Sequence, residues 1–153
     1  QSKYFDKIQP ILEEIGGEAI AVNFSEQERN LYHASAVVAS NYLNSVVFIA
    51  KNIIAKSGLS PEVLLPLIQQ TINNNIIEVN DKDSFPITGP IARRDFHTLT
   101  KHLDALQLYP EMKELYTLLS LTTAKICSTI NILTVKDWNE MLNVFQQHES
   151  NKE

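Results

Sequence analysis

The 153-residue chain contains one cysteine, Cys127, and its basic residues form no continuous stripe. A single cysteine excludes an internal disulfide and a zinc site built from cysteine pairs, and its apolar neighbours predict a small buried core residue. Because the net charge is −5 and the sequence has no basic patch, duplex nucleic acid is not an expected partner.

The motifs of several common chemistries are also missing. The sequence has no Gly-x-Gly-x-x-Gly nucleotide fingerprint, no P-loop, no Gly-x-Ser-x-Gly elbow and no zinc-helix motif. His97 and His102 lie five residues apart, about 140° around a helix at about 100° per residue, so they share no metal-binding face. No intact dinucleotide-binding domain and no metal are therefore expected in this chain.

Long unbroken apolar runs are absent too. The most apolar stretch, residues 34–50, is interrupted by serine and asparagine and never reaches the roughly 18 apolar residues of a typical membrane span. We therefore expect a buried core helix and no membrane partner. The polar start of the chain has no basic region leading into an apolar one, so no signal peptide is predicted and a cytoplasmic location is expected.

Most of the sequence shows apolar residues at helical spacing. Gly16-Gly17 ends the first predicted helix, residues 19–22 form an apolar run of strand length, and residues 80–90 are irregular. The predicted helices cover residues 4–15, 25–56, 61–79, 91–106, 110–130 and 135–147. The fold class is therefore all-α from residue 25 onward, preceded by a short αβ unit whose strand needs partners from elsewhere.

Details of three helices are predicted as well. Pro66 should kink the helix over residues 61–79. The Thr134–Asp137 pair resembles an N-terminal cap of the last helix. The helix over residues 110–130 places an apolar set on one side, namely Leu115, Leu118, Leu119, Thr122 and Ile126.

The predicted helix over residues 25–56 begins with a capping box at Ser25 and Glu28 and is apolar almost all round in its middle. Such a helix must be covered on every side. Small residues at positions 34, 35, 36, 39, 40 and 45 let neighbours approach closely. Because about five helices in one small domain cover it only with difficulty, we predict that a second subunit completes the cover in a homodimer.

Two polar clusters lie on predicted helices. His33 and Asn41 are eight residues apart, about 80° around the helix axis and about 12 Å along it, so both can line one side of a cleft. The alternative is a satisfied core histidine and a buried asparagine. Thr71 and the asparagines at positions 73–75 either contact a polar ligand or mark a fraying helix end.

The most informative cluster is the proline-flanked turn that begins at Pro86. It is expected to deliver Thr88 and Gly89 to the N-terminus of the next helix, where free N–H groups and the helix dipole favour an anion. Arg93 can bind a carboxylate through two parallel hydrogen bonds, and Asp95 can cap the helix or pair with an arginine. The alternative is a capped turn with solvated charges.

These residues occur in an order that resembles a known family. The ordered set is Tyr32-His33-Ala34-Ser35-Ala36, Ala39-Ser40-Asn41-Tyr42-Leu43, Pro66-Leu67 with Thr71 and Asn74, Thr88-Gly89-Pro90 with Arg93 and Asp95, and His102-Leu103-Asp104-Ala105-Leu106. Over residues 25–130 it resembles a C-terminal domain of unknown function that follows a Rossmann-like NAD(P)-binding domain. That architecture is similar to pyrroline-5-carboxylate reductase, ketopantoate reductase and the 6-phosphogluconate dehydrogenase group.

The resemblance implies a helical bundle of the 6-phosphogluconate dehydrogenase C-terminal-domain type over residues 25–148, with a long central helix. Residues 1–24 would be the remnant of a Rossmann-like domain, and the polar residues 149–153 a disordered tail. The cofactor, NAD or NADP, would be bound mainly by a domain missing from this chain. By analogy, the residues facing the nicotinamide and a small-molecule substrate are the catalytic His33 and Asn41 and the substrate-binding Asn74, Thr88, Gly89 and Arg93.

Two positions depart from the family pattern. Arg94 stands where glycine is usual between the arginine and the aspartate, and a bulky side chain there is expected to alter the pocket or its backbone. The related hydroxyacid dehydrogenases carry a catalytic lysine four residues before the helix asparagine, and here that position is Val37. His33 is therefore the better candidate acid, because imidazole titrates near neutral pH.

The sequence thus favours the substrate-side and dimerisation domain of an NAD(P)-dependent oxidoreductase that acts on a small carbonyl, imine or hydroxy acid and is inactive without its dinucleotide-binding domain. A purely structural dimerisation domain and a freestanding helical protein that binds a small acid are the alternatives.

Overall fold

The computed structural model describes residues 4–18, 20–78 and 87–150, and none of these residues forms a strand. The predicted all-α class is confirmed. The strand predicted over residues 19–22 is not formed: residues 20–22 have no regular structure, because a strand is held by hydrogen bonds to a neighbouring strand, and residue 19 lies outside the described residues. The described residues fall into two compact units that divide after Phe48, and the predicted domain boundary at residue 24 stays a prediction.

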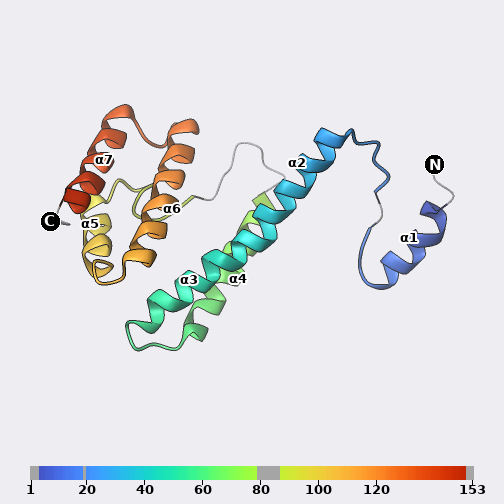
Figure 1. Ribbon diagram of the computed structural model, residues 1–153, viewed down its shortest axis with the longest axis horizontal. Helices are drawn as coiled ribbons and strands as arrows, with labels where there is room; N and C mark the ends of the chain where they lie inside the picture. The colour runs from blue at the N-terminus through green and yellow to red at the C-terminus, as the bar shows by residue number, and fades with distance from the viewer. Residues whose placement is uncertain (1–3, 19, 79–86, 151–153) are drawn as a thin grey trace. The chain divides into compact units, whose positions relative to one another are not determined.

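The first unit begins with helix α1 (Phe5–Glu14; Figure 1). The glycine pair stops it as predicted, since Gly16 adopts φ 76° and the Gly17 N–H donates to the Leu12 carbonyl at 2.8 Å. Glycine accepts this left-handed conformation without a Cβ clash. No residue of α1 is buried, so this unit has no core of its own around the helix.

The long helix follows as α2 (Glu26–Ala36), a π-helical segment η1 (Val37–Tyr42) and α3 (Leu43–Ala55). Its predicted capping box is confirmed: the Ser25 N–H donates to Glu28 Oε2 at 2.8 Å, and the Glu28 N–H donates to Ser25 Oγ at 3.3 Å. The Ser25 hydroxyl also donates to Glu28 Oε2, at 2.7 Å, and this bond together with that from the Ser25 N–H holds the pKa of the Glu28 carboxyl below its usual value. Gly58, at φ 79°, ends the helix as predicted.

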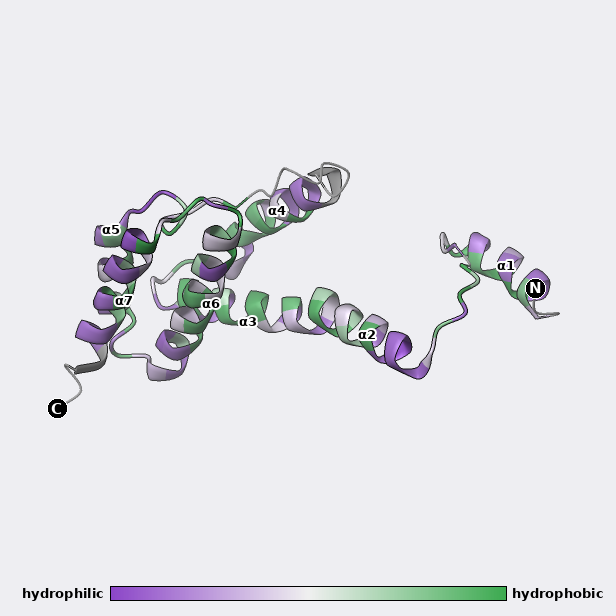
Figure 2. Ribbon diagram, turned by 90° about the horizontal axis from the view of Figure 1, so that it is seen from above, coloured by the Kyte–Doolittle hydropathy of each residue, from purple (hydrophilic) through white to green (hydrophobic). Residues whose placement is uncertain are grey.

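Apolar residues of the long helix remain accessible. None of the residues of α2, η1 or α3 is buried, so the predicted core helix is not buried within this chain. Figure 2 shows that α3 is strongly apolar. The 30-residue helix Glu26–Ala55 is long and apolar enough to cross a membrane, judged by length and composition alone. Val38 and Tyr42 are each 59% exposed, which leaves a surface that requires further cover.

The second unit continues from the end of α3 with a 3₁₀ turn, η2 (Pro61–Leu64), and α4 (Leu65–Glu78). Pro61 occupies the first helical position as predicted, and the Ser60 hydroxyl accepts from the Glu62 N–H at 3.4 Å. Pro66 lies in the first turn of α4 and not in a kinked interior. The α-helix restarts just before it, where the missing N–H would have no partner in any case.

Helices α5 (Phe96–Ala105), α6 (Pro110–Thr129) and α7 (Val135–Ser150) form one bundle (Figure 1). Its largest fully buried side chains are Leu99 and Leu103 of α5, Cys127 of α6 and Met141 of α7. Cys127 is therefore the predicted core residue, and burial raises the pKa of its thiol. The core joins three helices that are consecutive in sequence, so short connections suffice to build it.

The face that α6 buries differs from the predicted one. Its buried residues are Lys113, Ser120, Ala124 and Cys127, whereas three of the predicted apolar set remain exposed, namely Leu118 (53%), Leu119 (40%) and Ile126 (37%). Small residues allow α5 and α7 to pack closely against one side of α6. The larger apolar side chains are left on the opposite side.

The last helix begins with a confirmed cap. The Thr134 N–H donates to Asp137 Oδ2 at 2.8 Å, and the Asp137 N–H donates to Thr134 Oγ1 at 3.2 Å. The helix ends later than predicted, because α7 continues through Ser150, two residues into the predicted disordered tail. Residues 151–153 lie outside the described residues.

Replacing Leu99 with alanine should destabilise the bundle by about 2–5 kcal/mol, since a fully buried leucine leaves a cavity. Leu118→Ala is the matched control on α6 and should cost less than about 1 kcal/mol. Urea denaturation followed by circular dichroism measures both. Equal losses for the two variants would mean that Leu118 is covered in solution.

Candidate functional site

His33 and Asn41 lie on the long helix, His33 in α2 and Asn41 in η1. Both residues are exposed, and neither side chain has a hydrogen-bond partner among the described residues. The alternative of a satisfied core histidine and a buried asparagine is therefore wrong for this chain. These two unpaired polar side chains of the long helix are available to a ligand or to another polypeptide.

The π-helical segment changes the angle between His33 and Asn41 around the helix axis. A π-helix closes i→i+5 hydrogen bonds and so winds each residue through a smaller angle than an α-helix. Because residues 37–41 are wound in this way, Asn41 lies closer to the line of His33 than the 80° expected for regular winding. π-helical segments are frequent at functional sites. The residue pattern gave no signal for this segment.

The polar residues near the end of α4 bond mainly within their own helix. Gln70 Nε2 donates to Asn74 Oδ1 at 2.6 Å, and Asn75 Nδ2 donates to the Thr71 carbonyl at 2.8 Å. The helix runs to Glu78, so residues 73–75 are not its fraying end. Asn74 is exposed and keeps its amide N–H₂ group available, and its predicted role in substrate binding stays a prediction.

The turn after residue 86 is built differently from the prediction. Helix α5 begins at Phe96, not at residue 91, and Asp95 is its N-cap. The Asp95 carboxylate accepts from the Thr98 hydroxyl at 2.7 Å and from the Thr98 N–H at 3.0 Å. These hydrogen bonds hold the pKa of Asp95 below its usual value. The helix terminus is thus occupied by the chain's own carboxylate, and Thr88 and Gly89 do not reach it.

Residues 89–95 instead form tight turns before the helix. Gly89 has φ 99°, the Asp95 N–H donates to the Pro90 carbonyl at 2.8 Å, and Arg94 adopts φ 59°. Thr88 and Arg93 are exposed, and the Arg93 side chain has no ion-pair partner within the described part of the chain. Arg93 is therefore available to an external carboxylate, and its predicted role in substrate binding stays a prediction.

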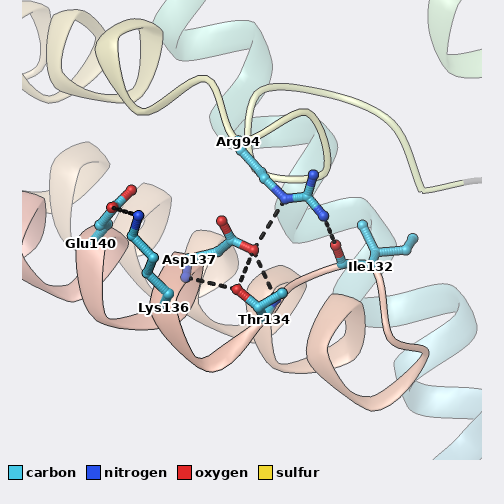
Figure 3. Close-up of polar contacts among 6 residues, drawn as sticks. All are labelled: Arg94, Ile132, Thr134, Lys136, Asp137 and Glu140. Carbon is cyan, nitrogen blue, oxygen red and sulfur yellow. Dashed lines mark hydrogen bonds and ion pairs between the residues drawn. The ribbon is translucent and has the colours of Figure 1, made fainter.

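Arg94 stands at the position where the resemblance noted in the sequence implies glycine. Its left-handed backbone is the conformation that glycine adopts most easily. The side chain reaches the start of α7, where Nε donates to Asp137 Oδ2 at 3.1 Å and an Nη donates to the Ile132 carbonyl at 2.7 Å (Figure 3). Asp137 is held ionised by hydrogen bonds from Thr134 and by the nearby Arg94, which lower its pKa. The arginine thus ties the turn before α5 to the start of α7.

A cleft of about 510 Å³ is lined by the end of α3, by α5 and by α6. Its polar side chains are Lys56, Ser57, His102, Tyr109 and Tyr116. His102 Nδ1 and the Tyr116 hydroxyl share a hydrogen bond of 2.8 Å, with the two rings edge to face. Lys56 lies over the Tyr109 ring at 5.1 Å from its centroid. The rest of the lining is mainly apolar, so the cleft fits a small, largely apolar ligand with one or two polar atoms.

His102 and Tyr116 share one proton in the hydrogen bond between the imidazole Nδ1 and the phenol oxygen. Burial raises the pKa of the Tyr116 hydroxyl, and a hydrogen bond with Ser120 partly offsets that effect. The neutral phenol can donate to a ligand oxygen while the imidazole accepts or donates beside it. Sequence reasoning rejected His102 as part of a metal pair, named it only within the family resemblance, and missed Tyr116. No signal in the sequence joins these two residues, because they lie on different helices.

The predicted site residues are divided between the two units of the chain. His33 and Asn41 belong to the first unit, whereas Asn74, Thr88, Gly89 and Arg93 belong to the second, and none of these four lines the His102 cleft. Among the described residues, no group of three or more His, Cys, Asp or Glu side chains is placed to hold a metal ion. The assembly of the predicted residues into one site stays a prediction.

A family model described as "Domain of unknown function (DUF2520)" matches residues 1–123. No curated protein matches the chain, and no solved structure matches it either. The family match includes all six predicted site residues and the His102–Tyr116 cleft. It ends within α6, before the second half of the bundle core.

Replacing Arg94 with glycine and with alanine separates the contribution of its side-chain hydrogen bonds from the cost of its left-handed backbone. Both variants lose the hydrogen bonds to Asp137 and Ile132, but only alanine keeps a Cβ in a left-handed backbone. Arg94→Gly should therefore be more stable than Arg94→Ala by about 1 kcal/mol. Thermal unfolding of the two purified variants measures the difference. Equal stability would mean that the backbone at position 94 is not left-handed in solution.

Proposed function

We propose, from the premise that this chain belongs to the family described as a domain of unknown function (DUF2520), that it is the substrate-side and dimerisation domain of an NAD(P)-dependent oxidoreductase. The substrate would be a small carbonyl, imine or hydroxy acid. The observation that carries the proposal is the long apolar helix that presents unpaired His33 and Asn41 next to a π-helical segment. The resemblance of these residues to reductase C-terminal domains supports it.

The dinucleotide does not fit this chain alone. The 153 residues contain no Gly-x-Gly-x-x-Gly fingerprint, and the described residues include no strand to carry one. A domain outside these residues would bind NAD or NADP, which supplies or accepts the hydride. This chain would then contribute one wall of the substrate pocket.

The residues of this chain would bind and orient the substrate and move a proton. His33 would donate a proton to the substrate oxygen or nitrogen during reduction, since Val37 replaces the lysine of the related dehydrogenases. Asn41, brought toward the same side by the π-helical winding, would donate a hydrogen bond to the same atom. Arg93, which is exposed and has no ion-pair partner among the described residues, would hold a substrate carboxylate.

Dimerisation would provide the cover that the long helix lacks. An exposed valine, leucine or isoleucine gives up about 1.5–3 kcal/mol of burial free energy, and Leu31 and Val38 are each more than half exposed. Serine and asparagine side chains interrupt the apolar surface, which favours a protein neighbour able to hydrogen-bond over lipid tails. A second copy of the chain would supply that neighbour in a homodimer.

The His102 cleft favours a second candidate function. A largely apolar cavity of about 510 Å³ with a hydrogen-bonded His102–Tyr116 pair is suited to hold a small molecule without any cofactor. On this alternative the chain is a non-catalytic helical domain that dimerises or binds a small ligand. The two candidates differ in whether His33 and Asn41 matter for turnover.

Turnover by the complete gene product that contains these residues tests the first candidate. With NADH or NADPH and a panel of small carbonyl and imine acids, we expect reduced nicotinamide to be consumed. His33→Ala should lower kcat by about 10²-fold or more, since it removes a general acid, and Asn41→Ala should also lower it.

His97→Ala, an exposed histidine on α5, is the matched control and should leave kcat unchanged. Unaltered turnover in both His33→Ala and Asn41→Ala would rule out their catalytic roles. A gene product that consumes no nicotinamide with any substrate would leave the non-catalytic candidate.

The dimer is tested by light scattering coupled to size-exclusion chromatography. Wild type should elute with the mass of two chains, and Val38→Asp should elute as a monomer because a carboxylate cannot be buried against an apolar neighbour. Gln27→Asp, at the polar start of the same helix, should remain a dimer. A monomeric wild type that floats with phosphatidylcholine vesicles would instead identify a membrane surface as the cover.

A further inference from the structure

Lys113 is a buried cation in the α5–α7 bundle. Its exposed fraction is 8%, although lysine is almost never buried unless it is paired. Burial of an ammonium group is costly unless its charge is compensated. The role of Lys113 therefore depends on which groups contact its ammonium.

Both partners of the Lys113 ammonium are uncharged. Nζ donates to Gln107 Oε1 and to the His148 carbonyl, the latter at 3.2 Å. An ammonium has three donors, so at least one remains. No carboxylate lies within ion-pair distance of Lys113 among the described residues. Within the part of the chain that the structure describes, the Lys113 ammonium thus has no negatively charged partner.

The other charged groups near Lys113 are His148 and Asp104, which bond to each other, and Glu114, which lines the same cavity without an ion pair to Lys113. His148 Nδ1 bonds to the Val144 carbonyl at 2.8 Å, and Nε2 bonds to Asp104 Oδ1 at 3.0 Å. Asp104 is therefore committed to His148, and Glu114 is an exposed residue with no ion pair to Lys113.

A cavity of about 650 Å³ opens beside Lys113. Apolar side chains from all three helices line it, chiefly Leu103, Leu118, Leu121 and Phe145. The rest of the wall is formed by Pro110 and by the polar or charged side chains of Gln107, Lys113, Glu114, Thr117 and His148. This volume suits a small organic ligand. The cavity contains none of the residues of the proposed substrate site and is distinct from the His102 cleft.

We propose that this cavity is a second ligand site that binds an aliphatic carboxylate, with the carboxylate on the Lys113 ammonium and the alkyl chain against Leu118, Leu121 and Phe145. The carboxylate would supply the missing negative charge through a charge-assisted hydrogen bond. The alkyl chain would cover part of the apolar side of α6 that the bundle leaves exposed. The site goes beyond the proposed oxidoreductase function and does not depend on it.

Lys113 also has a structural role, because it bonds to a carbonyl in the last turn of α7. A binding role and a purely structural role differ in one respect. Only a binding site distinguishes a ligand's carboxylate from a neutral head group on the same alkyl chain. The test therefore compares octanoate with octanol.

Calorimetry and amide NMR on the full chain make this comparison. Octanoate should bind and shift amides near Thr117 and Phe145, and octanol should bind at least tenfold more weakly, because it lacks the charge that pairs with the ammonium. Lys113→Met should weaken octanoate binding by tenfold or more, whereas Lys113→Arg, which keeps the charge, should retain it. Lys136→Met, an exposed lysine on α7, is the matched control and should bind octanoate as wild type does.

Four results would overturn the proposal. These are no octanoate binding to wild type, equal affinity for octanoate and octanol, undiminished octanoate binding by Lys113→Met, or shifts confined to the His102 cleft near Ser57 and Tyr109. If Lys113→Met does not fold, the proposal is still tested by comparing octanoate with octanol on wild type and by octanoate binding to Lys113→Arg. Wild type keeps the ammonium, and Lys113→Arg keeps its positive charge. None of these readouts involves nicotinamide turnover, so failure here leaves the proposed function intact.

Discussion

Removal of apolar side chains from water is the constraint on which this structure depends, and the chain meets it unevenly. The α5–α7 bundle encloses Leu99, Leu103 and Met141 completely. The helix from Glu26 to Ala55 is at least as apolar but has no buried residue. Burial contributes about 25 cal/mol per Å² of apolar surface, so the uncovered helix represents a large unused stabilisation. A helix of this kind requires a neighbour in its working state.

The polar side chains have different roles in the buried bundle and on the exposed long helix. Within the bundle they act as ties: Arg94 reaches across to Asp137, and His148 reaches Asp104. On the long helix His33 and Asn41 have no partner among the described residues. Ties within the folded bundle stabilise a scaffold, whereas unpaired groups on an uncovered surface are available for chemistry or assembly. The proposed function uses this division, with the bundle as support and the long helix as the wall of a pocket.

The π-helical segment and the left-handed arginine are both local departures from regular backbone geometry, and both lie within the residues that the family model matches. Val37–Tyr42 changes the winding at Asn41, and Arg94 takes the backbone conformation of a glycine. Such departures cost free energy and persist only where the surroundings support them. Hydrogen bonds to Asp137 and Ile132 provide that support for Arg94. For the π-helical segment, the proposed role at a substrate pocket gives a reason for its presence.

Much of the fold was determined by the sequence alone, because the deciding signals are local. Helix periodicity, the Ser25–Glu28 capping box and the left-handed stops at Gly16 and Gly58 need only neighbouring residues, and all of them were predicted correctly. Of the candidate site, the sequence identified His33 and Asn41 as polar residues on an apolar helix.

Tertiary structure decided what depends on residues distant in sequence. The turn before α5 is held by hydrogen bonds from Arg94 to Asp137 and to the Ile132 carbonyl, and the buried side of α6 is the side on which the bundle core forms. The pairing of His102 with Tyr116 and the burial of Lys113 arise only when separate helices pack together. Packing selects among faces that the periodicity leaves equally apolar, and this is why the sequence predicted the helices but not the two cavities between them.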